Sequence, residues 1–219
     1  MYLKICGLRD PAHAAHAARL GADAVGVVMS PRSPRHANRT EAAAVIAAAR
    51  AEAPAIDTAL VVNTLPAAEA AALAAELGFD VLQLHGPYDA ADFADARRIL
   101  PRIWRATSLA SEPDLRAGDR AEERLLLDGA TPGSGETWDV RPLGSDPALR
   151  ARIGDGWILA GGLSPENVAE AISHARPWGV DVSSGVESAP GVKDPGRIAR
   201  FIAAARAAGG PGRGATAAS

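Results

Sequence analysis

The chain has one cysteine and almost no lysine. A single cysteine excludes an intramolecular disulfide and a metal site built from several cysteines, so Cys6 is either a buried thiol or a reactive one. Of the 23 basic residues, only Lys4 and Lys193 are lysines and all others are arginines. A lysine retained against that background indicates a place where the guanidinium fork does not fit, although chance explains Lys193 equally well.

Long hydrophobic runs and a basic excess are also missing. No apolar run reaches the roughly 18 residues that span a bilayer, so we expect no membrane partner. The net charge of −3 gives no basic face for nucleic acid. A strand-like run follows Met1 almost at once, which predicts that no signal peptide precedes the fold and that the protein is cytoplasmic. With 219 residues, 47% of them hydrophobic, the chain can bury one sizeable core.

Apolar runs of strand length alternate with alanine-rich helical patterns along the whole chain. The predicted strands cover residues 2–6, 23–29, 56–62, 80–85, 102–107, 124–128, 157–160 and 178–183. A helix is expected after each of them, including a short one at 112–117 and one that Ser164 caps with Pro165 at its first position. The last helix is expected at 195–208.

This alternation predicts a parallel sheet, because each short parallel crossover needs a helix. A doubly wound open sheet and a closed barrel both satisfy it. The strands are short and evenly spaced, and no Gly-x-Gly-x-x-Gly follows the first, which favours the barrel. We therefore predict an α/β fold, a single-domain (β/α)8 TIM barrel over residues 1–208, shorter than the typical length of about 250 residues. Residues 209–219 carry no apolar stripe and are predicted to be a disordered tail.

In such a barrel, polar groups at the carboxyl ends of the strands face the active site. The strand ends carry Cys6, the loop 30–36, Asn63, His85, Thr107, Asp128, Gly161-Gly162 and Ser183-Ser184. No three of these groups make a plausible metal cage, so we expect no metal. His85 is expected to be structural, because neutral histidine commonly hydrogen-bonds nearby backbone or carboxylate groups.

The turns after the seventh and eighth strands predict a phosphate site. They contain Gly161, Gly162, Ser183, Ser184 and Gly185. Backbone N–H groups exposed at helix starts suit a phosphate, and barrels commonly hold one in these two loops. Tight turns that need glycine for backbone geometry are the alternative, and the joint position of the two turns favours phosphate.

Cys6 and Asp128 are the candidate acid–base pair. A thiolate at one strand end could abstract a proton and an acid across the barrel mouth could deliver one. Residue statistics alone favour a buried, inert thiol for Cys6. Asp128 closes Leu125-Leu126-Leu127, where an acid without a partner cannot be a core residue.

The loop 30–36 holds Arg32 and Arg35 between two prolines. Arginine forks match carboxylates bidentately, so this loop could bind a carboxylate away from the phosphate. A solvated surface loop is the safer interpretation from the residues alone.

Lys4 and Asp181 are predicted to form a buried ion pair below the site. Strand residues two apart share a face, so Lys4 lies below Cys6 on the first strand and Asp181 lies below Ser183 on the last. First and last strands are neighbours in a closed barrel. The pair should hold the floor of the site and bias the Cys6 thiol towards its anion. The alternative is a rotated first strand with Lys4 in solvent.

Taken in order, these segments resemble phosphoribosylanthranilate isomerases, the tryptophan-pathway isomerases of the ribulose-phosphate-binding barrel group. The resemblance runs from residue 4 to 198. It rests on Lys4-Ile5-Cys6-Gly7-Leu8, Gly21-Ala22-Asp23-Ala24-Val25-Gly26, Ser33-Pro34-Arg35, Gln83-Leu84-His85-Gly86, Leu126-Leu127-Asp128, Gly133-Ser134-Gly135, Gly161-Gly162-Leu163-Ser164-Pro165-Glu166-Asn167 and Asp181-Val182-Ser183-Ser184-Gly185-Val186-Glu187. Met29-Ser30 and Trp138-Asp139-Val140 depart from the family pattern.

The resemblance implies an Amadori rearrangement of N-(5-phosphoribosyl)anthranilate. Asp128 maps to the family's general acid, Cys6 to its general base and Arg35 to the residue that binds the anthranilate carboxylate. Gly161, Gly162, Ser183, Ser184 and Gly185 fall at the phosphate turns. The implied partner is this small molecule with no cofactor, and the expected assembly is a monomer, with a homodimer as the alternative.

Three other functions compete. A histidine-pathway isomerase of the same barrel group uses the same chemistry but normally carries aspartate where Cys6 stands. A related lyase or epimerase would need lysines or metal-binding histidines at the strand ends. A catalytically dead sugar-phosphate sensor would have no reason to keep both Cys6 and Asp128.

Overall fold

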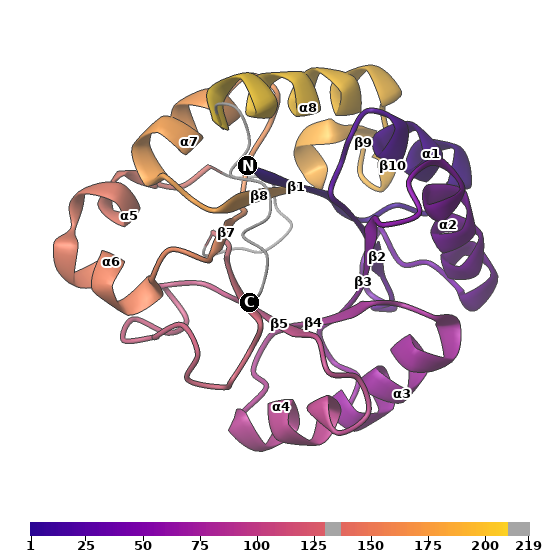
Figure 1. Ribbon diagram of the computed structural model, residues 1–219, viewed down its shortest axis with the longest axis horizontal. Coiled ribbons are helices and arrows are strands. Elements are labelled where there is room, and N and C mark those ends of the chain that lie inside the picture. Colours follow the sequence, from indigo (N-terminus) through magenta and orange to yellow (C-terminus); the bar gives the residue numbers. More distant parts are fainter. Residues whose placement is uncertain (130–136, 210–219) are drawn as a thin grey trace.

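Each predicted apolar run forms a strand of one sheet in the computed structural model, which describes residues 1–129 and 137–209. The parallel strands close into a barrel in chain order, so the first strand pairs with both the second and the last. The strands are β1 (Tyr2–Ile5), β2 (Ala24–Val28), β3 (Asp57–Val62), β4 (Val81–His85), β5 (Ile103–Thr107), β6 (Arg124–Leu127), β7 (Ile158–Leu159) and β8 (Gly179–Val182). The predicted (β/α)8 barrel is confirmed (Figure 1).

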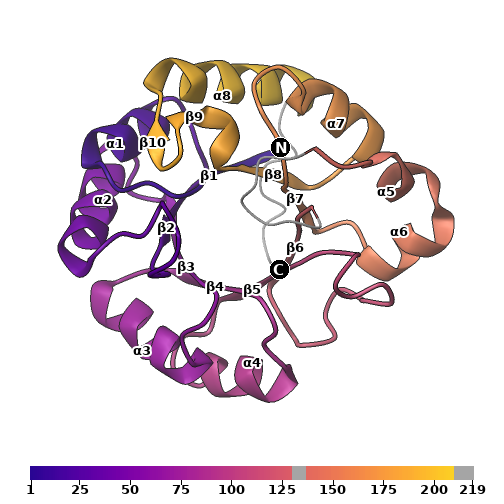
Figure 2. The same cartoon turned by 180° about the vertical axis from the view of Figure 1, so that it is seen from behind.

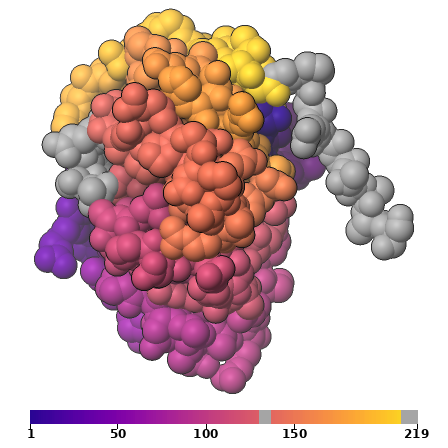
Figure 3. Space-filling model, turned by 90° about the vertical axis from the view of Figure 1, so that its left-hand side faces the viewer, coloured from indigo at the N-terminus to yellow at the C-terminus, as the bar shows by residue number. Residues whose placement is uncertain are grey.

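The helices surround the barrel, as the views from its two ends show (Figure 1, Figure 2). In the described ranges they are α1 (Pro11–Arg19), α2 (Arg39–Glu52), α3 (Ala67–Leu77), α4 (Ala90–Arg97), α5 (Arg141–Ser145), α6 (Pro147–Ile153), α7 (Val168–Ala175) and α8 (Pro195–Gly209). From one side, α5, α6 and α7 form the outer surface in coral and orange (Figure 3). None of these helices is long and apolar enough to cross a membrane.

Helix starts follow the capping signals of the sequence. The Asp10 side chain accepts a hydrogen bond from the Ala12 N–H at 2.8 Å just ahead of α1. Asn38 and Glu41 form a capping box at the start of α2. Such caps satisfy backbone donors that lack a partner within the helix.

The helix predicted at 112–117 is absent, and that prediction is wrong. The segment between β5 and β6 instead folds around the Glu112 carboxylate. Glu112 accepts hydrogen bonds from the buried Arg105 guanidinium, from Thr107 Oγ1 at 2.7 Å and from Arg120 at 2.8 Å. The ion-pair cluster orders the segment in place of a helix.

The start predicted for α7 is also wrong. The helix begins at Val168 and not at Ser164, and a turn covers residues 165–167. Asn167 organises this turn, since its Oδ1 accepts from the Ser164 N–H and its Nδ2 donates to Gly162 O, both at 2.8 Å.

A short hairpin that the sequence analysis did not anticipate follows β8. The 3₁₀ turn η1 (Ser184–Val186) leads into β9 (Glu187–Ala189), which pairs with β10 (Val192–Lys193). The last helix, α8, ends at Gly209. The remaining residues of the predicted tail, 210–219, lie outside the described residues.

Aromatic side chains close the barrel at the amino-terminal ends of its strands. Tyr2 stacks on Trp178 with ring centroids 4.6 Å apart and meets Trp104 edge-on at 5.9 Å. Small and branched residues fill the interior around Trp104, among them Ala59, Val81, Ala106, Leu126 and Ile158. This packed end leaves the carboxyl ends of the strands as the place for a cavity.

Candidate active site

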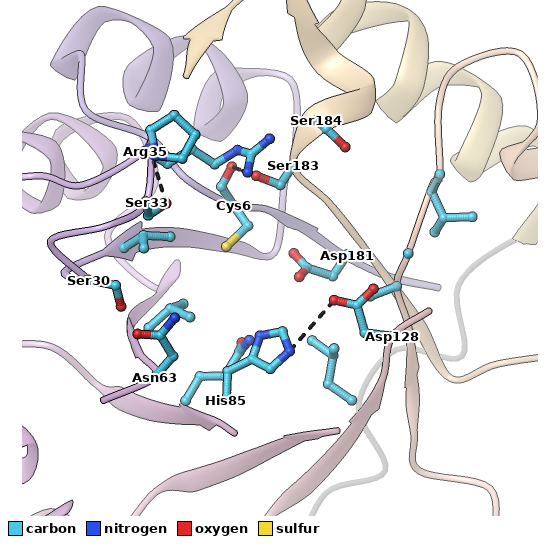
Figure 4. A pocket seen from close by; sticks show the side chains of 18 of the residues that line it. Cys6, Ser30, Ser33, Arg35, Asn63, His85, Asp128, Asp181, Ser183 and Ser184 are labelled. Atoms are coloured by element: carbon cyan, nitrogen blue, oxygen red, sulfur yellow. Dashed lines mark hydrogen bonds and ion pairs between the residues drawn. The ribbon is translucent and has the colours of Figure 1, made fainter. Parts of the chain in front are cut away.

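A cavity of about 350 Å³ opens at the carboxyl ends of the strands. It brings together most of the residues singled out in the sequence, and Figure 4 shows the labelled side chains turned towards it. Among them are Cys6, Arg32, Arg35, Asn63, His85, Asp128, Gly161, Gly162, Asp181, Ser183 and Ser184. Lys4 and Gly185 do not line the cavity and lie behind its wall.

Lys4 and Asp181 form the ion pair that strand order predicts. The two residues are register partners on β1 and β8, and Lys4 Nζ lies 3.0 Å from Asp181 Oδ1. Lys4 is fully buried. Gly26 on β2 leaves the space, because a Cβ there would lie 2.8 Å from Cys6 Sγ and 3.1 Å from Lys4 Cε.

The Cys6 thiol faces the cavity from the end of β1 (Figure 4). Burial raises its pKa above the usual value, Lys4 and Lys193 lower it, and Asp181 raises it. The net direction is upward. Lys4 has the largest effect of the charged neighbours and favours the anion as expected, but burial outweighs it.

Asp128 follows β6 and enters the same cavity. Burial raises the pKa of its carboxyl to about 6, although the Gly129 N–H donates to Oδ1 at 2.7 Å and lowers it in part. Gly161 packs directly on this carboxylate, since a Cβ there would lie 2.7 Å from Oδ1. An acid with this pKa is protonated in about a tenth of the molecules at pH 7, far more than an ordinary aspartate, which suits a general acid.

His85 lies opposite Asp128, with Nε2 3.7 Å from Asp128 Oδ2. No described protein atom hydrogen-bonds this buried nitrogen, and burial lowers the pKa of the imidazole to about 4. Gln83 sits two residues earlier on β4 and also lines the cavity, with a buried Oε1 that no described group hydrogen-bonds. Gln83 was not predicted as a site residue, although its spacing of two from His85 places both side chains on one face of β4.

The glycine turns line the cavity as predicted. Gly161 and Gly162 have φ of +86° and +64°, a left-handed region that favours glycine. Gly185 packs the turn after β8 against the turn after β7, because a Cβ there would lie 1.8 Å from Leu163 O. The stretch Gly133-Ser134-Gly135 lies outside the described residues.

Arg35 is buried against Glu187, whereas Pro31, Arg32 and Pro34 of the same loop are exposed. Arg35 Nε donates to Glu187 Oε1 at 2.7 Å and Nη2 donates to Oε2 at 2.9 Å. The bidentate contact predicted for a ligand carboxylate is made here by the protein's own glutamate. Lys193 also reaches Glu187 Oε1, at 2.7 Å. Glu187 was missed as a partner because 152 residues separate it from Arg35.

The cavity thus combines a thiol, a carboxylic acid, glycine turns and a buried arginine. Across residues 1–129 and 137–209, no three His, Cys, Asp or Glu side chains are grouped to hold a metal ion. An acid and a thiol that face one cavity can move protons at two atoms of the same bound molecule.

Comparisons with known proteins give the family of the chain. The family model of N-(5'phosphoribosyl)anthranilate (PRA) isomerase matches residues 3–204. The N-(5'-phosphoribosyl)anthranilate isomerase of Paracoccus denitrificans is 44% identical over 217 residues, covering 94% of this chain and 97% of the relative. The crystal structure of TrpF from Jonesia denitrificans has a TM-score of 0.83 and 50% identity, covering 95% and 98% of the two chains.

A further solved structure contains a ligand. It is a phosphoribosyl anthranilate isomerase in complex with reduced 1-(o-carboxyphenylamino)-1-deoxyribulose 5-phosphate, with a TM-score of 0.76 and 31% identity over 94% of this chain and 98% of that one. The family match spans almost the whole barrel, and the relatives are covered nearly end to end. This chain belongs to the N-(5'-phosphoribosyl)anthranilate isomerase family of enzymes.

Proposed function

We propose that this protein catalyses the Amadori rearrangement of N-(5-phosphoribosyl)anthranilate to 1-(2-carboxyphenylamino)-1-deoxyribulose 5-phosphate in tryptophan biosynthesis. The observation that carries the proposal is that Cys6 and Asp128 open into one cavity with the two glycine turns and Arg35. The ligand of the 31%-identical relative is a reduced form of this product, which supports the same substrate class.

Asp128 acts first, as the general acid. It protonates the furanose ring oxygen, so that the bond from this oxygen to C1′ breaks and a Schiff base forms. The pKa of about 6 leaves a useful fraction of Asp128 protonated near neutral pH. A weaker shift would leave almost no acid form at that pH.

Cys6 acts second, as the general base. Its thiolate takes the C2′ proton, the electrons move into the Schiff base, and the enolamine formed tautomerises to the ketone. Oxidation at C2′ balances reduction at C1′ within one molecule, so the reaction needs no cofactor. Burial raises the pKa of Cys6, and the cationic Schiff base formed beside it would favour the thiolate in the step where it is needed.

The two ends of the substrate are anions, and the cavity offers a place for each. We assign the phosphate to the turns of Gly161, Gly162, Ser183 and Ser184, with Gly185 packing those turns together. We assign the anthranilate carboxylate to Arg35. A ligand carboxylate there would have to exchange with Glu187 or approach the guanidinium from another direction.

The direct test is turnover of freshly prepared phosphoribosylanthranilate by the purified protein, followed as formation of the carboxyphenylamino-deoxyribulose phosphate. The histidine-pathway aminoimidazole carboxamide ribotide serves as the comparison substrate. We expect turnover of the first and none of the second. A folded protein that binds phosphoribosylanthranilate without converting it would overturn the proposal in favour of a sensor.

A further inference from the structure

Lys193, one of the two lysines in the chain, takes no part in the mechanism above. It lies on β10, and its side chain is 2% exposed. Its ammonium donates to Glu187 Oε1 at 2.7 Å, to Ser183 O at 2.8 Å and to Ser183 Oγ at 3.2 Å. An ammonium has three N–H donors, so these contacts use them all.

Each partner of Lys193 also contacts another residue that lines the cavity. Ser183 Oγ donates to Cys6 O at 3.2 Å, and Glu187 binds the Arg35 guanidinium. Gly7 allows Arg35 and Ser183 to lie close together. A Cβ at this position would lie 2.7 Å from Arg35 Cδ and 2.9 Å from Ser183 Oγ. Lys193 therefore connects the end of β1, the turn after β8 and the loop after β2.

The position suits lysine better than arginine. A compact ammonium can direct hydrogen bonds to three oxygens around one nitrogen atom, whereas the planar guanidinium fork cannot. An exposed neighbour on the same strand, Val192, makes a natural control, since 53% of its surface is accessible.

The charges around Cys6 come from several elements. Lys4 on β1 is paired with Asp181 on β8, and Lys193 is paired with Glu187, which also holds Arg35. His85 and Asp128 face the cavity from β4 and from the end of β6. Lys193 interacts favourably with the ionised thiol and offsets part of the effect of burial on its pKa.

We propose that Lys193 is a positioning residue of this site, which holds the turn after β8 and the Glu187–Arg35 pair in place beside Cys6 and stabilises the thiolate form of that cysteine. Its importance for turnover rests on the proposed function. Its effect on the thiol does not.

Alkylation by iodoacetamide tests this directly, because Cys6 is the only cysteine in the chain and its thiolate is the nucleophile that displaces iodide. The alkylation rate is measured by mass spectrometry against pH for the wild type, Lys193→Met, Glu187→Gln and the control Val192→Ala. We expect Lys193→Met to raise the thiol pKa by about one unit, which slows alkylation near neutral pH about tenfold. Val192→Ala should match the wild type.

Glu187→Gln should change the alkylation rate in the opposite direction. It removes the negative charge that offsets Lys193 and Arg35, so alkylation should become faster. A loosened pocket without an electrostatic role would shift both variants in the same direction. Shifts of one sign, or no shift in either variant, would overturn the proposal. If Lys193→Met does not fold, the pH profile of Glu187→Gln decides alone, because a loosened pocket changes the plateau rate at high pH and a changed charge moves the midpoint. A midpoint at lower pH supports the proposal, and an unchanged or higher midpoint contradicts it.

Turnover separates this inference from the proposed function. If the wild type converts phosphoribosylanthranilate, Lys193→Met should lower kcat and move the ascending limb of its pH profile upward, and Lys193→Arg should not restore either. If the wild type does not convert it, the proposed function fails while the alkylation series still decides the role of Lys193.

Discussion

Two walls of the cavity hold their polar groups in different ways. The ion-paired wall comes from β1, the loop after β2, β8 and the β9–β10 hairpin. Arg35 and Asp181 line the cavity there. Lys4, Glu187 and Lys193 lie behind them and pair with them or with each other at 2.7 to 3.0 Å. The weakly bonded wall consists of Gln83, His85 and Asp128. Its two titratable side chains, His85 and Asp128, are 3.7 Å apart, and two of its buried atoms have no hydrogen-bond partner among the described residues.

The difference separates positioning from proton transfer. Ion-pair partners keep a side chain charged whether or not a ligand is bound. A buried side chain without such partners changes its protonation state when a bound ligand brings a new charge close to it. On the weakly bonded wall, burial favours the neutral form of both groups, with a pKa of about 6 for Asp128 and about 4 for His85. Cys6 lies between the walls. Its thiol is buried, yet charges of the ion-paired wall surround it.

Asp128→Asn should cause the largest change, because it removes the proposed acid from the weakly bonded wall. A general acid typically contributes about 10²- to 10⁴-fold, so kcat should fall by that factor. The folded pKa of about 6 lies above the unfolded value of about 3.9. Wild-type stability should therefore fall as the pH rises from about 4 to about 6, by up to about 3 kcal/mol.

Asp128→Asn has no carboxyl group to ionise, so its stability should not fall between about pH 4 and about pH 6. Urea denaturation at pH 4 and at pH 8 should show Asp128→Asn more stable than the wild type at pH 8 only. An equal difference between the variant and the wild type at both pH values would show that burial of the Asp128 carboxylate does not destabilise the protein. A kcat above about a tenth of the wild-type value would contradict the acid role.

Lys4→Met should have the next largest effect, and on stability. Removing one partner of a buried ion pair typically costs about 3–5 kcal/mol, because the remaining charge stays buried and unpaired. The matched control is Lys4→Met combined with Asp181→Leu, which removes both charges and should lose less. Undiminished stability of Lys4→Met would mean that the pair does not hold the floor of the site.

Arg35→Ala should weaken substrate binding by about 1.5–3 kcal/mol, the usual contribution of a charge-assisted contact. KM for phosphoribosylanthranilate should rise, and inhibition by inorganic phosphate should change little because the phosphate turns lie elsewhere. Glu187 keeps Lys193 as a partner in this variant. An equal loss of affinity for phosphate ligands and for carboxylate ligands would show that Arg35 does not bind the carboxylate specifically.

His85→Asn should have the smallest effect on kcat. Since the pKa of His85 is lowered to about 4, the imidazole is neutral across the working range, and its removal should leave the pH profile between 5 and 8 unchanged. We expect a lower stability or a higher KM. A fall in kcat as deep as that of Asp128→Asn would assign His85 to the chemistry and not to the structure of the wall.

The barrel and the Lys4–Asp181 pair could be predicted because both follow from periodicity. Alternating elements imply parallel strands, closure makes β1 and β8 neighbours, and a spacing of two residues places Lys4 below Cys6. The same logic placed Asp128, His85 and the glycine turns at the mouth. These inferences depend only on local pattern and strand order.

The rest depends on contacts between distant side chains. Glu112 replaces a helix because Arg105 and Arg120 converge on it, and nothing in the local pattern of 112–117 indicates this. Glu187 reaches Arg35 through a hairpin whose strands have three and two residues, too short to leave a periodic signal. Strand spacing gives the position of Lys4, which favours the Cys6 thiolate, but it does not give the extent of burial, which raises the pKa of the thiol by more.

The central claim is that the Cys6 thiol takes the substrate proton in a cavity where Asp128 supplies one. The most direct measurement is kcat of Cys6→Ser on phosphoribosylanthranilate, with its free energy of unfolding measured alongside. We predict a variant as stable as the wild type whose kcat is lower by about 10²-fold or more, because a serine hydroxyl is far too weak an acid to form the required base. A folded Cys6→Ser variant that keeps more than about a tenth of wild-type kcat would contradict the account.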